Sequence, residues 1–361
     1  MINPKKILIA TGGTGGHVFP AYALAKHFTK KDYIVKIALD KRGFIFLRNY
    51  KDFDLKIISS SPMFKKNPIS ILLSFFKNIY ALLDSLFFLF KFKPNIVFGM
   101  GGYSSYPMCL ASKILKIKFI TYENNLYLGN TNKYLLSMAS KMLVANKELG
   151  GVNKKYVKKV FSVGNIVRQE ILAFNSSVES NQNILSILIL GGSQAAKIFG
   201  EKLPKIFEKC IQEKIRIKIF QQCLVSQKEE LKRFYENLGI EFEVFNFSHN
   251  LLNYFSKSNL VITRSGASMI AELLNCNIPF VSIPLPTAAD NHQFLNAKYF
   301  EKKGYGICIE EAEISLKLFQ LIKSIHKDKD LLNQIKKKQN EHSDKLVFEK
   351  IDEQLNELIN E

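Results

Sequence analysis

The sequence predicts an α/β protein with two doubly wound, Rossmann-like domains facing a central cleft. Three observations predict the two doubly wound domains. Short apolar runs alternate with helical patterns along most of the chain, which is typical of parallel βαβ units. An opening of strand, glycine loop and helix occurs once in each half. The length of 361 residues also exceeds what one hydrophobic core usually holds.

The elements of the first half follow in order from its apolar runs. The first run, residues 5–10, leads through the glycine loop of residues 11–17 into a helical pattern at residues 19–30. Apolar runs and helical patterns continue to alternate from there. The further strands expected in this half are residues 33–39, 95–98, 119–122 and 141–144.

The second half repeats the same order. Residues 184–190 form an apolar run, residues 191–196 a glycine loop and residues 197–210 a helical pattern. Ligands of doubly wound sheets bind at the carboxyl ends of the strands, so we expect the loops of both domains to line one cleft. The further strands expected are residues 216–221, 241–245, 260–263 and 280–283, and helices are expected beyond residue 311.

The domain boundary should lie near Gly164 or in the polar stretch of residues 175–183. We therefore predict an N-terminal domain at residues 1–163 and a C-terminal domain at residues 164–340. The amphipathic end of the chain, residues 341–361, is predicted to form a helix that returns to the N-terminal domain.

Composition restricts the classes of partner and site. Apolar residues make up 47% and charged residues 23% of the chain, as in folded globular proteins. A total of 51 Lys and Arg against 32 Asp and Glu gives a net charge of +19, which indicates an anionic partner. The basic residues are dispersed and no recognition motif occurs, which argues against nucleic acid. Five scattered cysteines without a CxxC pair argue against a disulfide framework or structural zinc, and fit a reducing compartment.

Four loops of small residues each precede a helical pattern. In the first, Gly12, Gly13, Gly15 and Gly16 would let a ligand approach the backbone, and the helix beyond offers free N–H groups to a phosphate or an oxyanion. A plain βα turn is the alternative. The loop lacks the third glycine of a dinucleotide fingerprint and the Lys–Ser/Thr of a Walker A loop. The other three loops are residues 98–107, 191–194 and 263–272.

Polar side chains beside these loops are candidates for catalysis and binding. The positive end of a helix disfavours an imidazolium, so His17 could be a neutral proton acceptor, or it could cap or pack at the helix start. Glu123 and Asn125 could bind sugar hydroxyls or cap the next element. Glu272, about a turn beyond its loop, could accept two ribose hydroxyls or complement the helix dipole. Residues 290–293 are a polar cluster of the kind that contacts a sugar.

These loops together resemble the MurG family, bacterial N-acetylglucosaminyltransferases of glycosyltransferase family 28. The resemblance implies a GT-B fold and an inverting mechanism without metal or cofactor. It implies transfer of GlcNAc from UDP-GlcNAc to the C4 hydroxyl of the MurNAc unit of lipid I, which gives lipid II for peptidoglycan synthesis. The matching residues follow the family order and are residues 12–20, 99–103, 123, 125, 130–133, 164, 165, 168, 191–194, 264–267, 271, 272, 290–293, 296 and 297.

Carried over residue by residue, the resemblance implies roles for individual side chains. It makes His17 the leading candidate for the catalytic base. It places the acceptor and the membrane on the N-terminal domain, at Gly101, Gly102, Tyr103 and Glu123. It places UDP-GlcNAc mainly on the C-terminal domain, and the donor contacts are Thr14, Gly15, Gly16, Asn125, Arg168, Ser193, Ser248, Ala267, Ser268, Met269, Ile270, Ala271, Glu272 and Gln293.

The sequence departs from the family pattern at three positions near these loops, and residues 248–250 lack the acidic pair that is common there. Tyr122 stands where the family usually has His, Asn124 where it has Gln, and Ala195 where it has Gly. Two other interpretations stay open beside the lipid I transferase. One is a related GT-B glycosyltransferase that makes glycolipids, and the other is a non-catalytic, membrane-bound sensor of nucleotide sugars.

Residues 69–92 are the most apolar stretch of the chain. Lys77, Asp84 and Lys91 interrupt it, which disfavours a membrane-spanning helix. A helix can begin at Ile69, with Asn67 as its cap and Pro68 in its first turn. Its apolar band is wider than a core stripe and comprises Leu72, Phe75, Phe76, Ile79, Leu83, Leu86, Phe87 and Phe90, widened by Leu73, Tyr80 and Phe88.

Part of this band should pack on the N-terminal sheet, and the alternative is that all of it does. Because the acceptor implied by the resemblance stays in the membrane, we predict that the rest docks peripherally on the cytoplasmic face of the bacterial inner membrane. Basic side chains favour contact with anionic headgroups. The lysines that flank the band are Lys65, Lys66, Lys77, Lys91 and Lys93.

Overall fold

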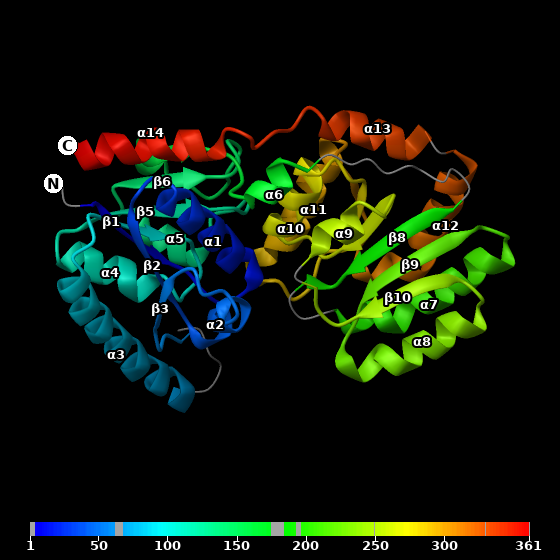
Figure 1. Cartoon of the computed structure of the whole chain (residues 1–361), viewed down its shortest axis with the longest axis horizontal. Coiled ribbons are helices and arrows are strands. Elements are labelled where there is room, and N and C mark those ends of the chain that lie inside the picture. Colours follow the sequence, from blue (N-terminus) through cyan, green and yellow to red (C-terminus); the bar gives the residue numbers. More distant parts are fainter. Residues whose placement is uncertain are drawn as a thin grey trace. The chain divides into compact units, whose positions relative to one another are not determined.

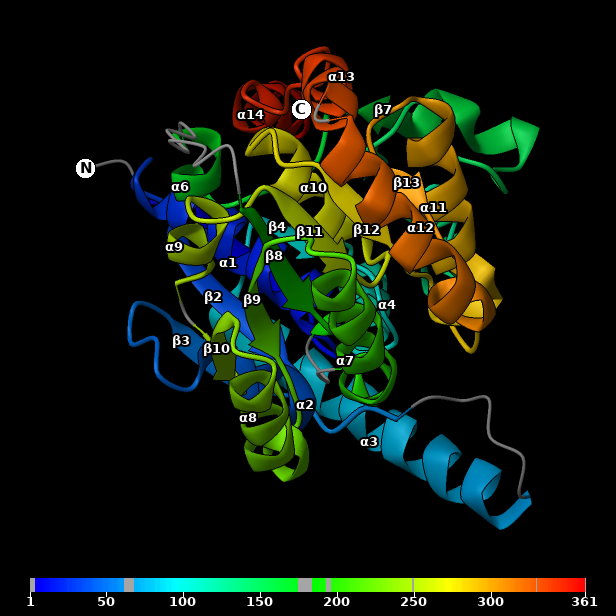
Figure 2. The same ribbon diagram turned by 90° about the vertical axis from the view of Figure 1, so that its right-hand side faces the viewer.

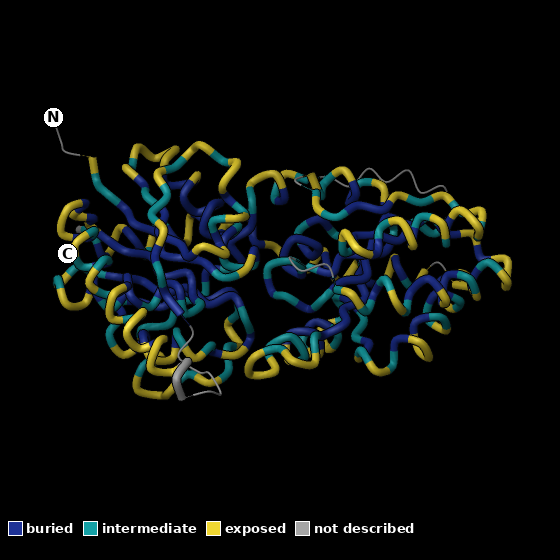
Figure 3. Tube along the Cα trace, turned by 90° about the horizontal axis from the view of Figure 1, so that it is seen from below, coloured by how far each residue is buried: buried dark blue, intermediate teal, exposed yellow. Residues whose placement is uncertain are grey.

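The computed structural model describes residues 4–61, 68–174, 184–192, 196–248, 250–328 and 330–360. They divide into two compact units, each with a parallel sheet between helices (Figure 1). The first unit comprises Met1–Arg168 and Asp344–Glu361, and the second comprises Gln169–Ser343. In both, the buried residues lie along the strands and the inner faces of the helices (Figure 3).

The first unit is built on seven parallel strands in the order β3-β2-β1-β4-β5-β6-β7. The chain starts in the middle, runs outward to β3 and then continues on the other side of β1. The order therefore reverses between β1 and β4, which is where doubly wound sheets bind their ligands. The strands are β1 (Lys6–Ala10), β2 (Ile34–Leu39), β3 (Asp54–Ile57), β4 (Ile96–Gly99), β5 (Lys118–Glu123), β6 (Lys141–Val144) and β7 (Val160–Ser162).

Helices cover both faces of this sheet. On one face, α3, α4 and α5 pack on alternate strand residues such as Leu8, Val97 and Phe119. The other face carries α1 and the C-terminal helix α14. The helices are α1 (Gly15–Thr29), α2 (Lys41–Leu47), α3 (Pro68–Phe92), α4 (Tyr106–Ile114), α5 (Asn130–Leu135), the 3-10 helix η1 (Lys154–Lys159) and α14 (Val347–Asn360).

The second unit repeats the plan with six parallel strands in the order β10-β9-β8-β11-β12-β13. Here the order reverses between β8 and β11. Its core packs strand residues such as Ile187 and Ile219 against Phe199 and Phe207 of α7. The strands are β8 (Leu185–Leu190), β9 (Ile217–Gln222), β10 (Glu241–Phe245), β11 (Leu260–Thr263), β12 (Phe280–Ser282) and β13 (Ile307–Cys308).

The helices of the second unit also lie on both faces of its sheet (Figure 2). Two doubly wound sheets confirm the predicted fold class. The helices are α6 (Gln169–Leu172), α7 (Lys197–Gln212), α8 (Lys228–Asn237), α9 (Leu251–Phe255), α10 (Ala267–Asn275), α11 (His292–Lys302), α12 (Ile314–Lys327) and α13 (Asp330–Gln339), with 3-10 turns η3 (Val225–Gln227), η4 (Ala289–Asn291) and η5 (Glu311–Glu313).

All the strands that the sequence predicts are present, with ends that differ by a residue or so. The structure adds β3, β7 and β13, which are edge strands of two to four residues. The first helix begins at Gly15 rather than Phe19, so His17 lies inside its first turn.

The chain passes between the units after Arg168 and returns at Asp344, whereas the sequence analysis placed these divisions after residues 163 and 340. The two passages are bonded to each other. Asp344 is buried, and its carboxylate accepts hydrogen bonds from the backbone N and the side-chain Nδ2 of Asn165 at 2.8 and 3.2 Å. Gly164 has a φ of +103°, and a Cβ atom there would lie 2.7 Å from Asp344 Oδ1, so this position requires glycine.

The C-terminal helix α14 is held on the first unit by charged and aromatic contacts. The Asp352 carboxylate oxygens lie 2.9 and 3.0 Å from His27 Nε2 of α1 and 2.7 Å from Lys31 Nζ. Phe348 stacks on the His27 ring with centroids 4.6 Å apart. Burial alone would raise the pKa of Asp352, but hydrogen bonds from His27 and Lys31 lower it below its usual value.

Replacing Asp352 by Asn is expected to lower the free energy of unfolding of the first unit by about 1–2 kcal/mol at pH 7, because a charged acceptor becomes a neutral amide. Since the folded-state pKa is depressed, the contribution is present above the unfolded pKa of about 3.9 and is lost as pH falls through the folded value. Urea unfolding at several pH values should show the difference between the proteins shrinking below about pH 4.

Asp54→Asn is the matched control. Asp54 pairs with Lys36 at the surface, where its side chain is 76% exposed. We expect the free energy of unfolding of the Asp54→Asn variant to differ from that of the wild type by less than about 0.5 kcal/mol. Equal effects of the two substitutions would contradict the role given to Asp352.

Candidate functional site

The loop after β1 brings open backbone N–H groups to the point where the strand order reverses. Thr14 is the N-cap of α1, is exposed and makes no side-chain cap, and no acidic residue lies in the first turn. The amides of Gly15 and Gly16 precede the first intrahelical bonds, so they are available to an anion. Thr11 Oγ1 donates to the carbonyl oxygen of His17 at 2.9 Å, which ties the end of β1 to this turn.

His17 brings the two glycine loops of the first unit together. A Cβ atom at Gly101 would lie 3.3 Å from Cε1 of the imidazole, and one at Gly102 would lie 3.6 Å from Cδ2. Both glycines have positive φ, at +83° and +72°. The half-buried ring therefore lies against the backbone of the β4–α4 loop, and only residues without side chains fit there easily.

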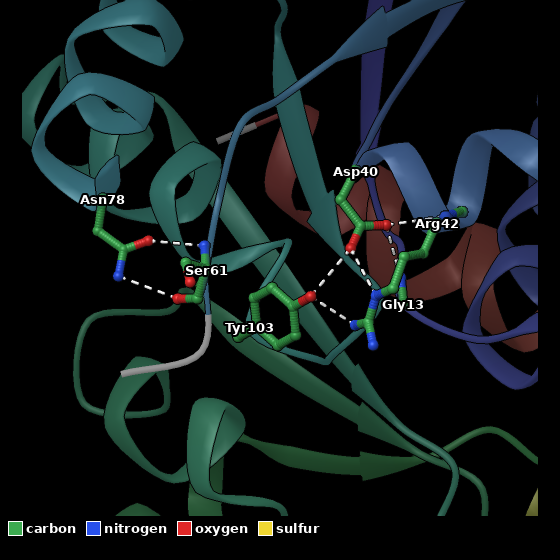
Figure 4. A network of polar contacts seen from close by, with 7 residues as sticks. Gly13, Asp40, Arg42, Ser61, Asn78 and Tyr103 are labelled. Carbon is green, nitrogen blue, oxygen red and sulfur yellow. Dashed lines mark hydrogen bonds and ion pairs between the residues drawn. The ribbon is translucent and has the colours of Figure 1, made fainter. Parts of the chain in front are cut away.

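A buried carboxylate connects the same two loops (Figure 4). Asp40, the N-cap of α2, accepts hydrogen bonds from the backbone N of Gly13 and of Gly43, both at 2.8 Å. The hydroxyl of Tyr103 donates to it at 3.1 Å, and Arg42 Nε lies 3.4 Å away. Burial would raise the pKa of Asp40, but these hydrogen bonds and the charge of Arg42 outweigh burial and lower it.

Glu123 organises the loop after β5. It is 3% exposed, and four donors surround its carboxylate. Oε1 accepts from the backbone N and Nδ2 of Asn125 at 3.1 and 2.9 Å, while Oε2 accepts from Gly129 N at 3.1 Å and Asn132 Nδ2 at 2.9 Å. Asn124 Nδ2 donates to the carbonyl of Gly16 at 3.2 Å, which joins this loop to the first glycine loop. Glu123 therefore acts within its own loop, and it fixes Asn125.

In the second unit, side chains connect the loops after β8, β9 and β10. Gln222 Oε1 accepts from Gly191 N at 3.2 Å, and its Nε2 donates to the carbonyl of Asn246 at 3.2 Å. Ser248 Oγ accepts from Asn250 N at 3.1 Å. Ser193 lies outside the described residues.

The loop between β11 and α10 ends in a helix N-terminus open to a ligand. Gly266 is the N-cap, no acidic residue lies in the first turn, and a Cβ atom at Gly266 would meet no atom of the described residues within 4 Å. The amide of Ile270 already donates to Gly266 O at 3.1 Å, so the amides of residues 267–269 are the ones left to bind an anion. Glu272, one turn further, is only 6% exposed.

Arg264 does not direct its guanidinium to this open helix end. Its Nη2 lies 2.5 Å from Glu311 Oε2, and its Nη1 donates to the carbonyls of Ile283 and Pro284 at 3.3 Å. The guanidinium also lies 5.0 Å from the ring centroid of Phe199. Arg264 lies in the loop of residues 263–272, and its side chain anchors this loop to Glu311 and to the segment after β12.

Gln293 joins the loop after β12 to α11, because its Oε1 accepts from Leu285 N at 3.0 Å. Asp290 and Asn291, just before α11, both adopt left-handed conformations with φ near +51° and +52°. Two consecutive non-glycine residues in this region mark a constrained turn.

The structure thus places the candidate residues at the carboxyl ends of strands in each unit. Among the residues that the structure describes, no group of three His, Cys, Asp or Glu could hold a metal ion. Sequence reasoning missed Asp40 and Arg42 as parts of the site, although Asp40 directly follows a predicted strand. The first unit holds Thr14, Gly15, Gly16, His17, Gly101, Gly102, Tyr103, Glu123, Asn125 and Arg168, and the second holds Ser248, Ala267, Ser268, Met269, Ile270, Ala271, Glu272 and Gln293.

The first part of helix α3 turns polar and small side chains inward, whereas Leu89 and Phe92 near its end are buried in the core. Ser74, Ala81 and Ser85 are buried against the first unit. The Asn78 amide pairs with both backbone groups of Ser61, at 3.0 Å each (Figure 4). These contacts fix the helix to the segment that follows β3.

The outward face of α3 is apolar, and Figures 1 and 2 show the helix along the outside of the first unit. Leu86 and Phe88 are half-buried and pack on the core, but most of the band is exposed, so the alternative that the whole band is core is wrong. Within the described chain, α3 has one stretch, Ile71–Phe92, with the length and hydropathy of a membrane span, which is weak evidence by itself. The exposed apolar residues of α3 are Ile71, Leu72, Leu73, Phe75, Phe76, Ile79, Tyr80, Leu83, Phe87 and Phe90.

Comparisons with known proteins agree with this architecture. Residues 7–144 match the glycosyltransferase family 28 N-terminal domain, and residues 186–353 match the family 28 C-terminal domain. Among solved structures, Acinetobacter baumannii MurG has a TM-score of 0.77 at 24% identity and covers 98% of this chain and 100% of its own. A co-structure of S. aureus MnaA with UDP has a TM-score of 0.70 at 16% identity, covering 99% and 97%. These likenesses show the GT-B fold.

Two relatives carry the name UDP-N-acetylglucosamine--N-acetylmuramyl-(pentapeptide) pyrophosphoryl-undecaprenol N-acetylglucosamine transferase. The one from Pelagibacter ubique is 37% identical over 339 residues, which cover 92% of each chain. The one from Rickettsia canadensis is 36% identical and covers 86% of this chain and 87% of its own. The chain therefore belongs to glycosyltransferase family 28, and within it to the MurG family.

Proposed function

We propose that this protein transfers GlcNAc from UDP-GlcNAc to the C4 hydroxyl of the MurNAc unit of lipid I, which gives lipid II for peptidoglycan synthesis. Its membership of the MurG family carries the proposal, since the relatives named above have this donor and acceptor in their names. The position of His17, in the first turn of α1 and against two glycines, is consistent with an acid–base role.

In the proposed reaction, His17 is the general base. The C4 hydroxyl of the acceptor attacks the anomeric carbon of GlcNAc from the side opposite UDP, and the imidazole takes the hydroxyl proton. The bond to the UDP oxygen breaks as the new glycosidic bond forms, so the configuration inverts. The positive end of α1 disfavours the imidazolium before reaction, which keeps the ring able to accept a proton.

The donor contacts are proposed mainly for the second unit. The free amides of Ala267, Ser268 and Met269 stabilise the charge of the diphosphate. Glu272 accepts the ribose hydroxyls from the next turn. Because the Ile270 amide is already bonded, Ile270 and Ala271 would contribute through shape. The other proposed donor contacts are Thr14, Gly15, Gly16, Asn125, Arg168, Ser193, Ser248 and Gln293.

The acceptor contacts are proposed for the β4–α4 loop, at Gly101, Gly102 and Tyr103. Glu123 is proposed to act on substrates through Asn125, because four donors from its own loop and from α5 already occupy its carboxylate. It is thus a positioning residue.

Radiolabel transfer from UDP-GlcNAc to a short-chain lipid I analogue tests the proposal. A labelled disaccharide lipid is the expected product. Transfer to other lipids but not to lipid I would indicate a glycolipid transferase. Binding of UDP-GlcNAc without any product would indicate a sensor.

His17→Ala is expected to lower kcat by about 10²–10⁴ and to leave the KM for UDP-GlcNAc nearly unchanged, because a base acts in the transition state and not in donor binding. Steady-state kinetics at neutral pH measures both constants. His326→Ala removes an exposed histidine of α12 and is the control. A kcat near that of the wild type would make His17 a structural residue.

Glu272→Gln is expected to weaken UDP-GlcNAc binding by about 1.5–3 kcal/mol, since a carboxylate that accepts two hydroxyls becomes an amide. Calorimetric titration with UDP-GlcNAc measures this. Because Glu272 is buried, thermal unfolding must first show that the variant folds. Glu230→Gln on α8 is the exposed control in the same unit, and equal affinity of all three proteins would remove Glu272 from the site.

We propose that α3 docks on the cytoplasmic face of the inner membrane, where the acceptor resides. Between Ile71 and Phe87, α3 buries small and polar side chains and exposes large apolar ones, which is the reverse of the usual pattern for a soluble surface. Such a face suits the boundary between headgroups and acyl chains. Lys77, Lys91 and Lys93 are exposed along it, and each adds about 1 kcal/mol of attraction near anionic lipids. Lys65 and Lys66 lie outside the described residues.

Replacing Phe75, Phe76 and Phe87 by Ser, with Lys65 and Lys66 by Gln, is expected to reduce sedimentation with anionic vesicles by roughly tenfold or more. Transfer to a short-chain, soluble lipid I analogue should survive, because the three phenylalanine side chains are exposed and lie outside the proposed substrate contacts.

Val225→Ser with Leu316→Ser is the matched control, since both residues are exposed apolar positions of the second unit, at 79% and 74%. This control should sediment like the wild type. A folded α3 variant that also sediments like the wild type would exclude this surface as the membrane contact.

A further inference from the structure

The network around Asp40 presents a cation that the proposed reaction does not use. Arg42 lies in the first turn of α2, and its side chain is 54% exposed, whereas that of Asp40 is 6% exposed. The carboxylate is thus buried and the guanidinium exposed to solvent, and Figure 4 shows the contacts between them.

Three contacts fix the orientation of the Arg42 guanidinium. Nη2 donates to the hydroxyl oxygen of Tyr103 at 2.5 Å, and Nε lies 3.4 Å from Asp40 Oδ2. The guanidinium carbon also lies 5.1 Å from the centroid of the Tyr103 ring. A long, flexible side chain is therefore held in one place before any ligand binds, which reduces the entropy lost on binding.

The charges of the network leave its outer face positive. Asp40 receives two backbone hydrogen bonds and one from Tyr103 in addition to Arg42, so its negative charge is well compensated below the surface. Burial and the neighbouring Asp40 raise the pKa of Tyr103, so its hydroxyl stays protonated and donates to Asp40. Among the described residues, Arg42 Nη1 has no hydrogen-bond partner, which leaves its N–H groups for a ligand.

The guanidinium lies at the meeting point of the two glycine loops. A Cβ atom at Gly13 would be 3.3 Å from Arg42 Nη2, so the cation covers the backbone of the first loop. Through Tyr103 it is bonded to the second loop, whose Gly101 and Gly102 lie against His17. A planar fork of N–H donors beside open backbone is well suited to phosphate oxygens.

We propose that Arg42 binds the diphosphate of the lipid-linked acceptor, with Asp40 and Tyr103 as the residues that position it. The inference rests on the proposed function and names a further substrate contact for it. The acceptor is favoured over the donor because Arg42 belongs to the first unit, with α3 and its apolar outer face.

The test compares Arg42→Ala, Arg42→Lys and the control Lys41→Ala, which removes a cation from the neighbouring exposed position. Calorimetric titration with geranyl diphosphate and geranyl monophosphate probes the lipid phosphate without any transfer. We expect Arg42→Ala to weaken diphosphate binding by roughly tenfold or more and monophosphate binding by less, because a bidentate, charge-assisted contact is lost. Arg42→Lys should be intermediate, since it keeps the charge without the fork.

Kinetics with a lipid I analogue gives a second measurement. Arg42→Ala should raise the KM for the acceptor by roughly tenfold or more while the KM for UDP-GlcNAc stays within about twofold. Unchanged diphosphate binding together with an unchanged acceptor KM overturns the inference, and so does an equal rise of both KM values. If wild-type protein transfers no GlcNAc but Arg42→Ala still loses diphosphate binding, the proposed function fails and the lipid diphosphate contact of Arg42 stands.

Discussion

The site in the first unit depends on one steric constraint. The loops after β1 and β4 carry no side chains where their backbones contact the His17 imidazole and the Asp40 carboxylate. The reversal of strand order between β1 and β4 brings these loops together. A Cβ atom at Gly12 would lie 2.7 Å from Asp40 Oδ1, and one at Gly101 would lie 3.3 Å from His17. The polar groups therefore occupy space that side chains would otherwise fill. This is why the glycines determine which groups can reach a substrate.

Charged groups around the loops divide according to where their hydrogen bonds go. The Glu123 carboxylate accepts hydrogen bonds from four donors of the protein itself. The Arg264 guanidinium is likewise bonded to Glu311 and to two backbone carbonyls. Both hold loops in shape, since a buried charge is tolerated only when it is well paired. Arg42 and the first amides of α10 keep donors unused. Charge type alone would have put Arg264 on a phosphate, and only the geometry separates these two roles.

The sequence predicts the interior of each sheet well, because buried parallel strands such as β1 and β8 are continuous apolar runs. It does not predict β3, β7 and β13, whose edge positions place little demand on side chains. Local motifs identify the glycine loops and His17. The Asp40 network joins residues from three separate loops, so no local pattern reveals it. The outward apolar face of α3 is visible in the sequence only as an unusually wide band, and the inward polar contacts that fix it come from the structure.

Tyr122 departs from the family pattern beside the candidate site, but its side chain makes its contacts elsewhere, at the passage between the units. It stands directly before Glu123, where the resemblance to the MurG family implies a histidine, yet Tyr122 is only 3% exposed and lies where the chain leaves the first unit. Its hydroxyl accepts from Ile166 N at 3.0 Å and donates to the carbonyl of Gly164 at 3.2 Å, and burial raises its pKa. Its carbonyl accepts from Asn132, which also binds Glu123. One residue thus couples the loop that fixes Asn125 to the passage between the units. A substitution at position 122 would therefore first alter the conformation of that passage and of the loop. It would affect the substrates only through these changes.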